Sequence, residues 1–112
     1  MKRIFTVLLL CVIASPLSAA TSFSKKTEVF LERHCIDCHG DGAAKGGLDL
    51  EKLGRDLSDA AVFAKWERIF DRVAAGEMPP AKVKNRPEAK ELTAFRAAFR
   101  PRLVQAHAAK KG

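Results

Sequence analysis

The chain contains three segments in which apolar side chains recur every three or four residues, which is the spacing of an amphipathic helix. Within residues 23–34 one helical face carries Phe23, Thr27, Phe30, Leu31 and His34. The strongest pattern spans residues 58–75, where one face carries Val62, Phe63, Trp66, Ile69, Phe70 and Val73. Ser58 is suited to cap the start of this second helix, and Gly76 is suited to end it.

A third helix is predicted to begin near Pro87, because proline is tolerated in a first helical turn. Leu92, Phe95 and Phe99 lie on one side of this helix. Pro101 predicts that it ends or kinks near Arg100, which leaves a basic, alanine-rich tail at about 101–112. No segment alternates as a half-buried strand does, so the pattern predicts an all-α fold of about three main helices.

Two loops connect the predicted helices. Residues 40–56 contain most of the glycines of the chain, so the backbone there can turn sharply and approach another group closely. Residues 76–86 form the second loop, which is stiffened by Pro79 and Pro80.

The first twenty residues have the layout of a secretory signal peptide. Lys2 and Arg3 precede an apolar run at 4–13, and small residues follow up to Ala20. We expect cleavage after Ala20, so that residues 1–20 are a signal peptide and residues 21–112 form one exported domain. A retained membrane anchor is the alternative, but the apolar run is about half of the roughly 20 residues that a spanning helix needs.

Loss of residues 1–20 changes the charge and the cysteine content. The net charge falls from +7 to +5 because Lys2 and Arg3 are removed, and Cys11 leaves with them. The expected product is a small, moderately basic protein in the periplasm or otherwise outside the cytoplasm, for which a cofactor would support a marginal core. No nucleic-acid recognition motif accompanies this charge, so nucleic acid is not an expected partner.

The strongest chemical signal is the sequence CIDCH from Cys35 to His39. Two thiols three positions apart on a helical turn can each add across one vinyl group of a porphyrin, and the following histidine can face the iron. This Cys-x-x-Cys-His pattern is typical of covalent haem attachment.

Three other uses of the cysteines are less consistent with the chain. A structural zinc ion would want four ligands, and beyond the motif residues 21–112 offer only His34 and His107. A thioredoxin-like dithiol would need strands in a βαβ arrangement, which the pattern does not predict. A disulfide that closes so short a loop would stabilise little.

Met78 is the candidate for the opposite side of the iron. It is the one methionine left after Met1 is removed, and it precedes Pro79 in a stiff loop, where proline favours extended geometry. A histidine and methionine pair is the ligand set of many electron-transfer cytochromes. Alternatives stay open at this point: a core methionine, ligation by His107, or an open site that would make the protein a ligand sensor or a weak peroxidase.

The order of these features resembles a known family. A helix, "CIDCHG", the glycine-rich "KGGLDL", a tryptophan-bearing helix, "GEMPP" and a terminal helix are similar to a small class I-type cytochrome c, and more narrowly to the planctomycete-type cytochrome c domain. The resemblance covers about residues 23–100. It implies a small cytochrome c fold packed around one covalent haem c, with Cys35 and Cys38 as thioether positions and His39 and Met78 as iron ligands.

The resemblance also implies roles for supporting residues. Phe30 is expected to contact Phe95 or Phe99 where the terminal helices cross, and Leu48 and Leu50 are expected to face the porphyrin. A backbone carbonyl of the glycine-rich loop is expected to accept the proton on the second nitrogen of His39. Trp66 is either a core residue or a donor to a haem propionate, and His34 has a surface or helix-end role.

Together these predictions describe an exported monohaem c-type cytochrome that carries single electrons and is not an enzyme. Lys82, Lys84 and Arg86 follow Met78, and a basic rim at this place would steer an acidic redox partner. A solvated loop is the simpler interpretation of these three residues.

Overall fold

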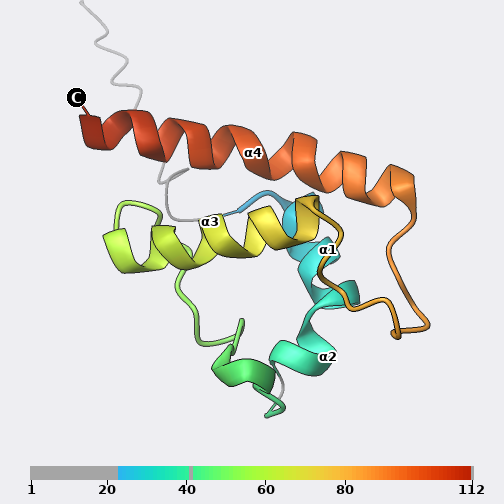
Figure 1. Ribbon diagram of the computed structural model, residues 1–112. Coiled ribbons are helices and arrows are strands. Elements are labelled where there is room, and N and C mark those ends of the chain that lie inside the picture. Colours follow the sequence, from blue (N-terminus) through green and yellow to red (C-terminus); the bar gives the residue numbers. More distant parts are fainter. Residues whose placement is uncertain (1–22, 41, 112) are drawn as a thin grey trace, which may run out of the picture.

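The computed structural model describes residues 23–40 and 42–111, and these residues form helices but no strand (Figure 1). The elements are α1 (Lys25–His34), α2 (Ile36–His39), the short 3-10 turn η1 (Lys45–Gly47), α3 (Ala60–Ala74) and α4 (Ala89–Lys111). The all-α prediction is confirmed for this part of the chain. The predicted signal peptide at 1–20 lies outside the described residues.

Side chains at the helix termini explain where two of the helices begin. Ser24 caps α1, and its hydroxyl accepts a hydrogen bond from the backbone N–H of Thr27 at 3.2 Å. The prediction that Ser58 caps α3 is wrong by one residue. Asp59 is the cap, because the Ser58 hydroxyl donates to the Asp56 carboxylate at 2.6 Å and is held in the preceding turn.

The end of α3 agrees with the sequence pattern. Gly76 follows the last turn with a φ of +77°, a left-handed conformation that glycine adopts without the steric cost of a Cβ atom. The chain therefore leaves α3 at the predicted residue.

Helix α4 continues through Pro101, so the prediction that it ends near Arg100 is wrong. Proline removes one backbone hydrogen bond, at a cost of about 3 kcal/mol in a helix interior. Leu103, beyond the proline, is only 7% exposed, and burial of a leucine side chain contributes about 1.5–3 kcal/mol. Ala97, whose carbonyl loses its partner, is exposed, so water can satisfy that oxygen.

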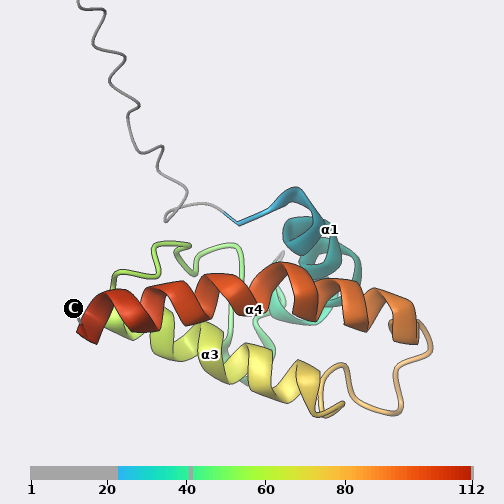
Figure 2. The same cartoon turned by 90° about the horizontal axis from the view of Figure 1, so that it is seen from above.

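The core lies where three helices meet. Figures 1 and 2 show α3 and α4 antiparallel and side by side, and α1 packs against α4. The predicted aromatic contact of the terminal helices is confirmed, since the rings of Phe30 and Phe95 stack with centroids 4.3 Å apart. The Phe23 ring packs edge-on against Trp66 and Phe99 at 4.8 and 4.9 Å.

Arg55 connects this core to the segment that follows α2. Its guanidinium lies 5.0 Å from the ring centroid of Trp66 and forms a salt bridge with Glu28 of α1 at 3.1 Å. The same group donates to the carbonyls of Leu50 and Leu53, both at 2.6 Å. Arg55 therefore fixes the loop after η1 against α1. Within residues 23–40 and 42–111, no helix is both long enough and apolar enough to cross a membrane.

Candidate cofactor-binding site

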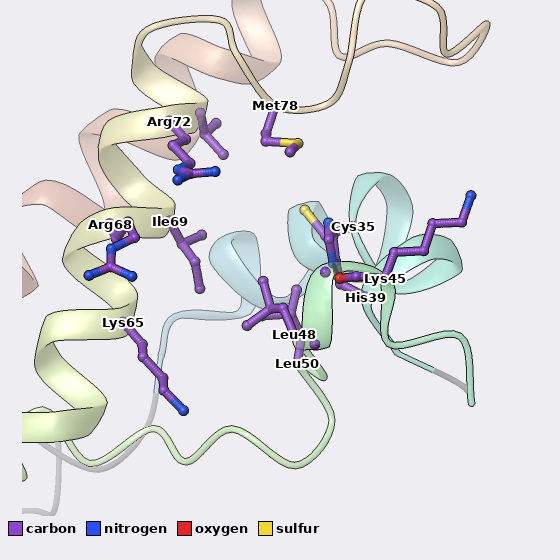
Figure 3. Close-up of a pocket in the computed structure, with 13 residues that line it drawn as sticks. Cys35, His39, Lys45, Leu48, Leu50, Lys65, Arg68, Ile69, Arg72 and Met78 are labelled. Carbon is purple, nitrogen blue, oxygen red and sulfur yellow. Dashed lines mark hydrogen bonds between the residues drawn. The ribbon is translucent and has the colours of Figure 1, made fainter.

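A cavity of about 340 Å³ lies between α3 and the segment that contains α2 and η1 (Figure 3). Its volume falls within the roughly 300–1,000 Å³ that is usual for sites of small molecules and cofactors. Five predicted site residues line it: Cys35, His39, Leu48, Leu50 and Met78. Ile69 and Val73 of α3 add apolar surface. The structure thus gathers residues that are up to 43 positions apart in the sequence.

His39 is held in one tautomer by a backbone group. Its Nδ1 atom lies 2.8 Å from the carbonyl oxygen of Lys45. Because a carbonyl oxygen can only accept, Nδ1 carries the proton, and in the neutral ring Nε2 keeps a lone pair that can coordinate a metal. The predicted hydrogen bond from His39 to the glycine-rich loop is therefore confirmed.

The turn that supplies this carbonyl depends on glycine. Gly46 and Gly47 follow Lys45 with φ values of +66° and +77°, and nothing lies within 4 Å of the position that a Cβ atom would take at either residue. Glycine is needed at these positions for the backbone conformation and not for space. The positive φ angles bring the Lys45 carbonyl back toward the ring of His39.

A second backbone bond joins α2 to the apolar wall. The N–H of Leu50 donates to the carbonyl of His39 at 2.5 Å, and Leu50 is only 1% exposed. The carbonyl of Leu50 accepts from Arg55, so the two backbone groups of this residue are both bonded. These bonds fix Leu50 beside His39. Whether Leu48 and Leu50 contact a porphyrin stays a prediction.

The two cysteines of the motif are free thiols. Cys35 lines the main cavity, and both cysteines line a smaller adjoining one of about 90 Å³ that is also lined by His39 and Met78. Burial, and after it the negative charge of a Cys38 thiolate, raises the pKa of the Cys35 thiol from 9.0 to about 12. A redox-active dithiol needs a lowered thiol pKa, so this environment does not suit thioredoxin-like chemistry.

Met78 reaches the site from the loop after α3. Its backbone N–H and that of Glu77 both donate to the carbonyl of Arg72, at 3.3 and 2.9 Å. The side chain of Met78 is half-buried and lines both cavities. The residue that the sequence predicted as a second ligand therefore lines the same cavity as His39.

The structure places two other candidates away from the main cavity. Trp66 is fully buried, and its indole N–H donates to the carbonyl of Gly54 at 2.7 Å, so the donor that a propionate would need is already used. His107 stacks on Phe63, with ring centroids 6.3 Å apart, in the last part of α4. Neither residue lines the main cavity.

His34 ends α1, as the helix-end prediction has it, but its side chain is only 1% exposed and so does not belong to the surface. Its Nε2 atom donates to the Glu91 carboxylate at 2.8 Å, because an ionised carboxylate can only accept. That hydrogen bond is also the largest of the effects that lower the pKa of Glu91. No pattern in the sequence predicted this link between α1 and α4.

Sequence reasoning also missed three basic residues on the cavity wall, Lys65, Arg68 and Arg72 of α3. Their spacing of three and four residues places them on one helical face, which was visible in the sequence. What the sequence did not show is that this face of α3 lies against the cavity. Figure 3 shows them along α3, across from Cys35 and His39.

A protein-only metal site is not formed in the described part of the chain, where no three His, Cys, Asp or Glu side chains are gathered for a metal ion. This arrangement does not supply the four ligands of a structural zinc ion.

Comparison with known proteins gives one result. Residues 35–82 match a family model described as planctomycete cytochrome C. Neither the curated proteins nor the solved structures gave a match to the chain. The matched segment begins at Cys35 and includes His39 and Met78, so it contains the residues that form the two cavity walls.

Proposed function

Because residues 35–82 are a planctomycete-type cytochrome c domain, we propose that the protein is an exported carrier of single electrons that holds one covalent haem c. In this proposal Cys35 and Cys38 form the thioether bonds, and His39 and Met78 are the axial ligands. When bound, the haem iron supplies the one-electron change between its ferric and ferrous states.

The hydrogen bond between His39 Nδ1 and the Lys45 carbonyl carries the proposal. It leaves Nε2 as the ligating atom and fixes the orientation of the ring, as the outer hydrogen bond of a ligating histidine usually does. The cavity in front of this ring has apolar walls and a thioether from Met78, which suits a porphyrin. The residues present therefore fit a haem.

Each residue has a defined part in holding the group. The S–H of each cysteine adds across one vinyl double bond, so a carbon–sulfur bond forms, the hydrogen goes to the second vinyl carbon, and no oxidant is needed. Leu50 and Val73, which are 1% and 2% exposed, exclude water from the apolar wall. Met78 would supply the second iron ligand, and a histidine and methionine pair raises the reduction potential.

Lys82, Lys84 and Arg86 are exposed on the loop that follows Met78. Val83 and Asn85 alternate with these basic residues in the sequence, and both line the smaller cavity, which Cys35 and Cys38 also line. Positive charge at this place supports docking of an acidic redox partner. The rate of electron transfer should then fall as ionic strength rises.

The mass of the protein purified after export tests covalent attachment. We expect the mass of the chain from residue 21 onward plus roughly 616 Da, the mass of iron protoporphyrin IX at a Cys-x-x-Cys-His site. Cys35→Ala with Cys38→Ala should remove this increment. A wild-type mass without the increment would refute the proposal.

Substitution of Met78 tests the second ligand. The oxidised wild-type protein should show the weak far-red absorption band of iron–methionine ligation, and Met78→Ala should abolish it and lower the reduction potential by on the order of 100 mV. His107→Ala is the matched control and should change neither. If Met78→Ala leaves the spectrum unchanged, the site is open or otherwise ligated, and a sensor or weak peroxidase becomes the better description.

A further inference from the structure

The residues assigned so far leave one feature of the cavity without a role. Lys65, Arg68 and Arg72 place three positive side chains on the α3 wall. All three residues are exposed, so their charged groups lie at the mouth of the cavity and not in its apolar interior. Lys45 of η1 adds a fourth positive charge to the lining.

These cations form no salt bridge within the part of the chain that the structure describes. Glu28 and Glu91 form the ion pairs of α1 and α4, but none of the three α3 side chains is in a salt bridge within residues 23–40 and 42–111. Like charges that face one cavity repel one another. A group with two negative charges at the mouth would relieve that repulsion, and a guanidinium can bind a carboxylate through two parallel hydrogen bonds.

We propose that Lys65, Arg68 and Arg72 bind the two propionate carboxylates of the haem. The inference rests on the proposed function and on the shape of the porphyrin, whose vinyl groups and propionates occupy opposite edges of the ring. With the vinyl edge fixed at Cys35 and Cys38, the carboxylates extend toward the opposite wall, which is α3 (Figure 3).

Trp66 cannot take this role in the structure described here, because its indole N–H is bonded to Gly54 inside the core. The titratable and charged groups that line the cavity are Cys35 and His39 beside α2, Lys45 of η1, and the three residues of α3. None of them is an acid, so a propionate meets only positive or neutral partners there.

The first test uses the haem-loaded protein and the double variant Arg68→Gln with Arg72→Gln. The reduction potential is measured from about pH 5 to about pH 9, a range that lies above the ordinary pKa of a carboxyl group. In the wild type the cations keep the propionates ionised, and the potential should be nearly independent of pH. In the double variant the potential should be lower throughout and should fall further as pH rises, because the apolar lining, no longer offset by the two arginines, raises the pKa of the propionates into this range.

Arg100→Gln is the matched control, since Arg100 is an exposed arginine of α4 outside the cavity lining. It should leave the potential and its pH profile unchanged, and Arg68→Lys with Arg72→Lys should restore the flat profile in part. A double variant with a lower potential but a flat profile would overturn the proposal. That result would mean that the arginines act through space on the iron or on a docked protein, without contact to the propionates.

A second test needs no variant. A water-soluble carbodiimide couples a carboxyl group to an amine in direct contact, which gives an amide. In the haem-loaded wild type, tryptic digestion should yield the haem peptide of Cys35 and Cys38 joined to the peptide that carries Lys65. Coupling through Lys82 or Lys84, or no coupling to Lys65, would overturn the assignment.

The failure of the proposed function and of this inference can be told apart. If the measured mass shows no covalent haem, the proposed function itself is refuted. A haem-loaded protein with the far-red band, a flat pH profile in the double variant and no amide at Lys65 refutes only the propionate site.

Discussion

The aromatic core of α1, α3 and α4 contains large buried side chains, whereas α2 and η1, which form one wall of the cavity, contain no buried residue. Trp66 and Phe99 are both 0% exposed, so the core is stabilised by removal of apolar surface from water. The cavity wall is instead held by hydrogen bonds to backbone carbonyls, chiefly from the His39 side chain to Lys45 and from the Leu50 N–H to His39.

This difference indicates which part of the molecule depends on the cofactor. The core has its own source of stability in packed rings from distant parts of the sequence. The wall has only local hydrogen bonds, each of which contributes about 0.5–1.5 kcal/mol. Its apolar surface is exposed to water unless a cofactor covers it. We therefore expect substitutions in the core to change stability most, and substitutions in the wall to change the spectrum and the potential.

The largest effect is expected for Phe99→Ala. Removal of a buried phenylalanine ring leaves a cavity and should lower the free energy of unfolding by about 3–5 kcal/mol, measured by denaturant titration. The reduction potential should stay the same, because Phe99 does not line the haem cavity. Val104→Ala, at a position that is 58% exposed, should cost less than about 0.5 kcal/mol. A loss for Phe99→Ala no larger than that of the control would contradict the role given to the core.

Arg55→Met tests the connection between the two regions. It removes two hydrogen bonds from a charged group to backbone carbonyls and the contact with Trp66, while it keeps an apolar stem. We expect a loss of at least about 1.5–3 kcal/mol in unfolding free energy, since each hydrogen bond to a charged group contributes about that much and two are removed. Unlike Phe99→Ala, this variant should also shift the potential, because Leu50 is released beside His39. An unchanged reduction potential would show that Arg55 does not influence the cofactor site.

Gly46→Ala tests the cavity wall itself. The left-handed conformation at this residue should cost alanine about 1–2 kcal/mol, and any relaxation moves the Lys45 carbonyl away from His39. Gly42→Ala is a matched control, because Gly42 also has a positive φ and open space around it but no bond to the site. Both variants should lose similar stability in denaturant titration, and only Gly46→Ala should alter the far-red band. If the far-red band is the same in both variants, the turn at Gly46 does not orient His39.

The smallest effect is expected for Glu91→Gln, which acts on the link between α1 and α4. The hydrogen bond from His34, and after it the backbone N–H of Glu88, lowers the pKa of Glu91 in the folded chain. A lowered folded pKa gives stability that is present above the unfolded value of about 4.5 and is lost as pH falls through the folded value. The stability difference between wild type and variant should therefore be present near neutral pH and disappear in acid. Glu67→Gln, at an exposed position of α3, should show no such pH dependence.

The helices and the Cys-x-x-Cys-His motif could be predicted from the sequence because both depend on residues that are close together in the chain. The period of apolar residues marks the face that packs, so the positions of α1, α3 and the start of α4 followed from it. The residues between Cys35 and His39 are adjacent in the chain, and the chemistry of thiols and imidazole identified them without a structure.

The predictions of helix ends were wrong where contacts with other parts of the chain determine the local structure. Ser58 and Asp59 are both good caps, and only the bond from Ser58 to Asp56 selects Asp59. Pro101 should end a helix by local rules, but burial of Leu103 keeps α4 intact.

The orientation of α3 could not be predicted for a similar reason. Periodicity shows that Trp66 belongs to an apolar face, but not that its N–H meets the carbonyl of Gly54. Nor does it show that Lys65, Arg68 and Arg72 border the cavity, since that depends on where the loop of residues 40–56 lies against the helix.

The buried thiol of Cys35 also bears on the order of events during maturation. With a pKa of about 12, its thiolate fraction at neutral pH is roughly 1,000-fold below that of a thiol with a pKa of 9.0. The higher nucleophilicity of a more basic thiolate compensates only in part, so thiol–disulfide exchange at Cys35 is slowed. In an oxidising compartment, the folded chain before haem attachment would keep Cys35 reduced for longer. The burial of Cys35 would thus preserve the S–H group that the proposed thioether bond requires.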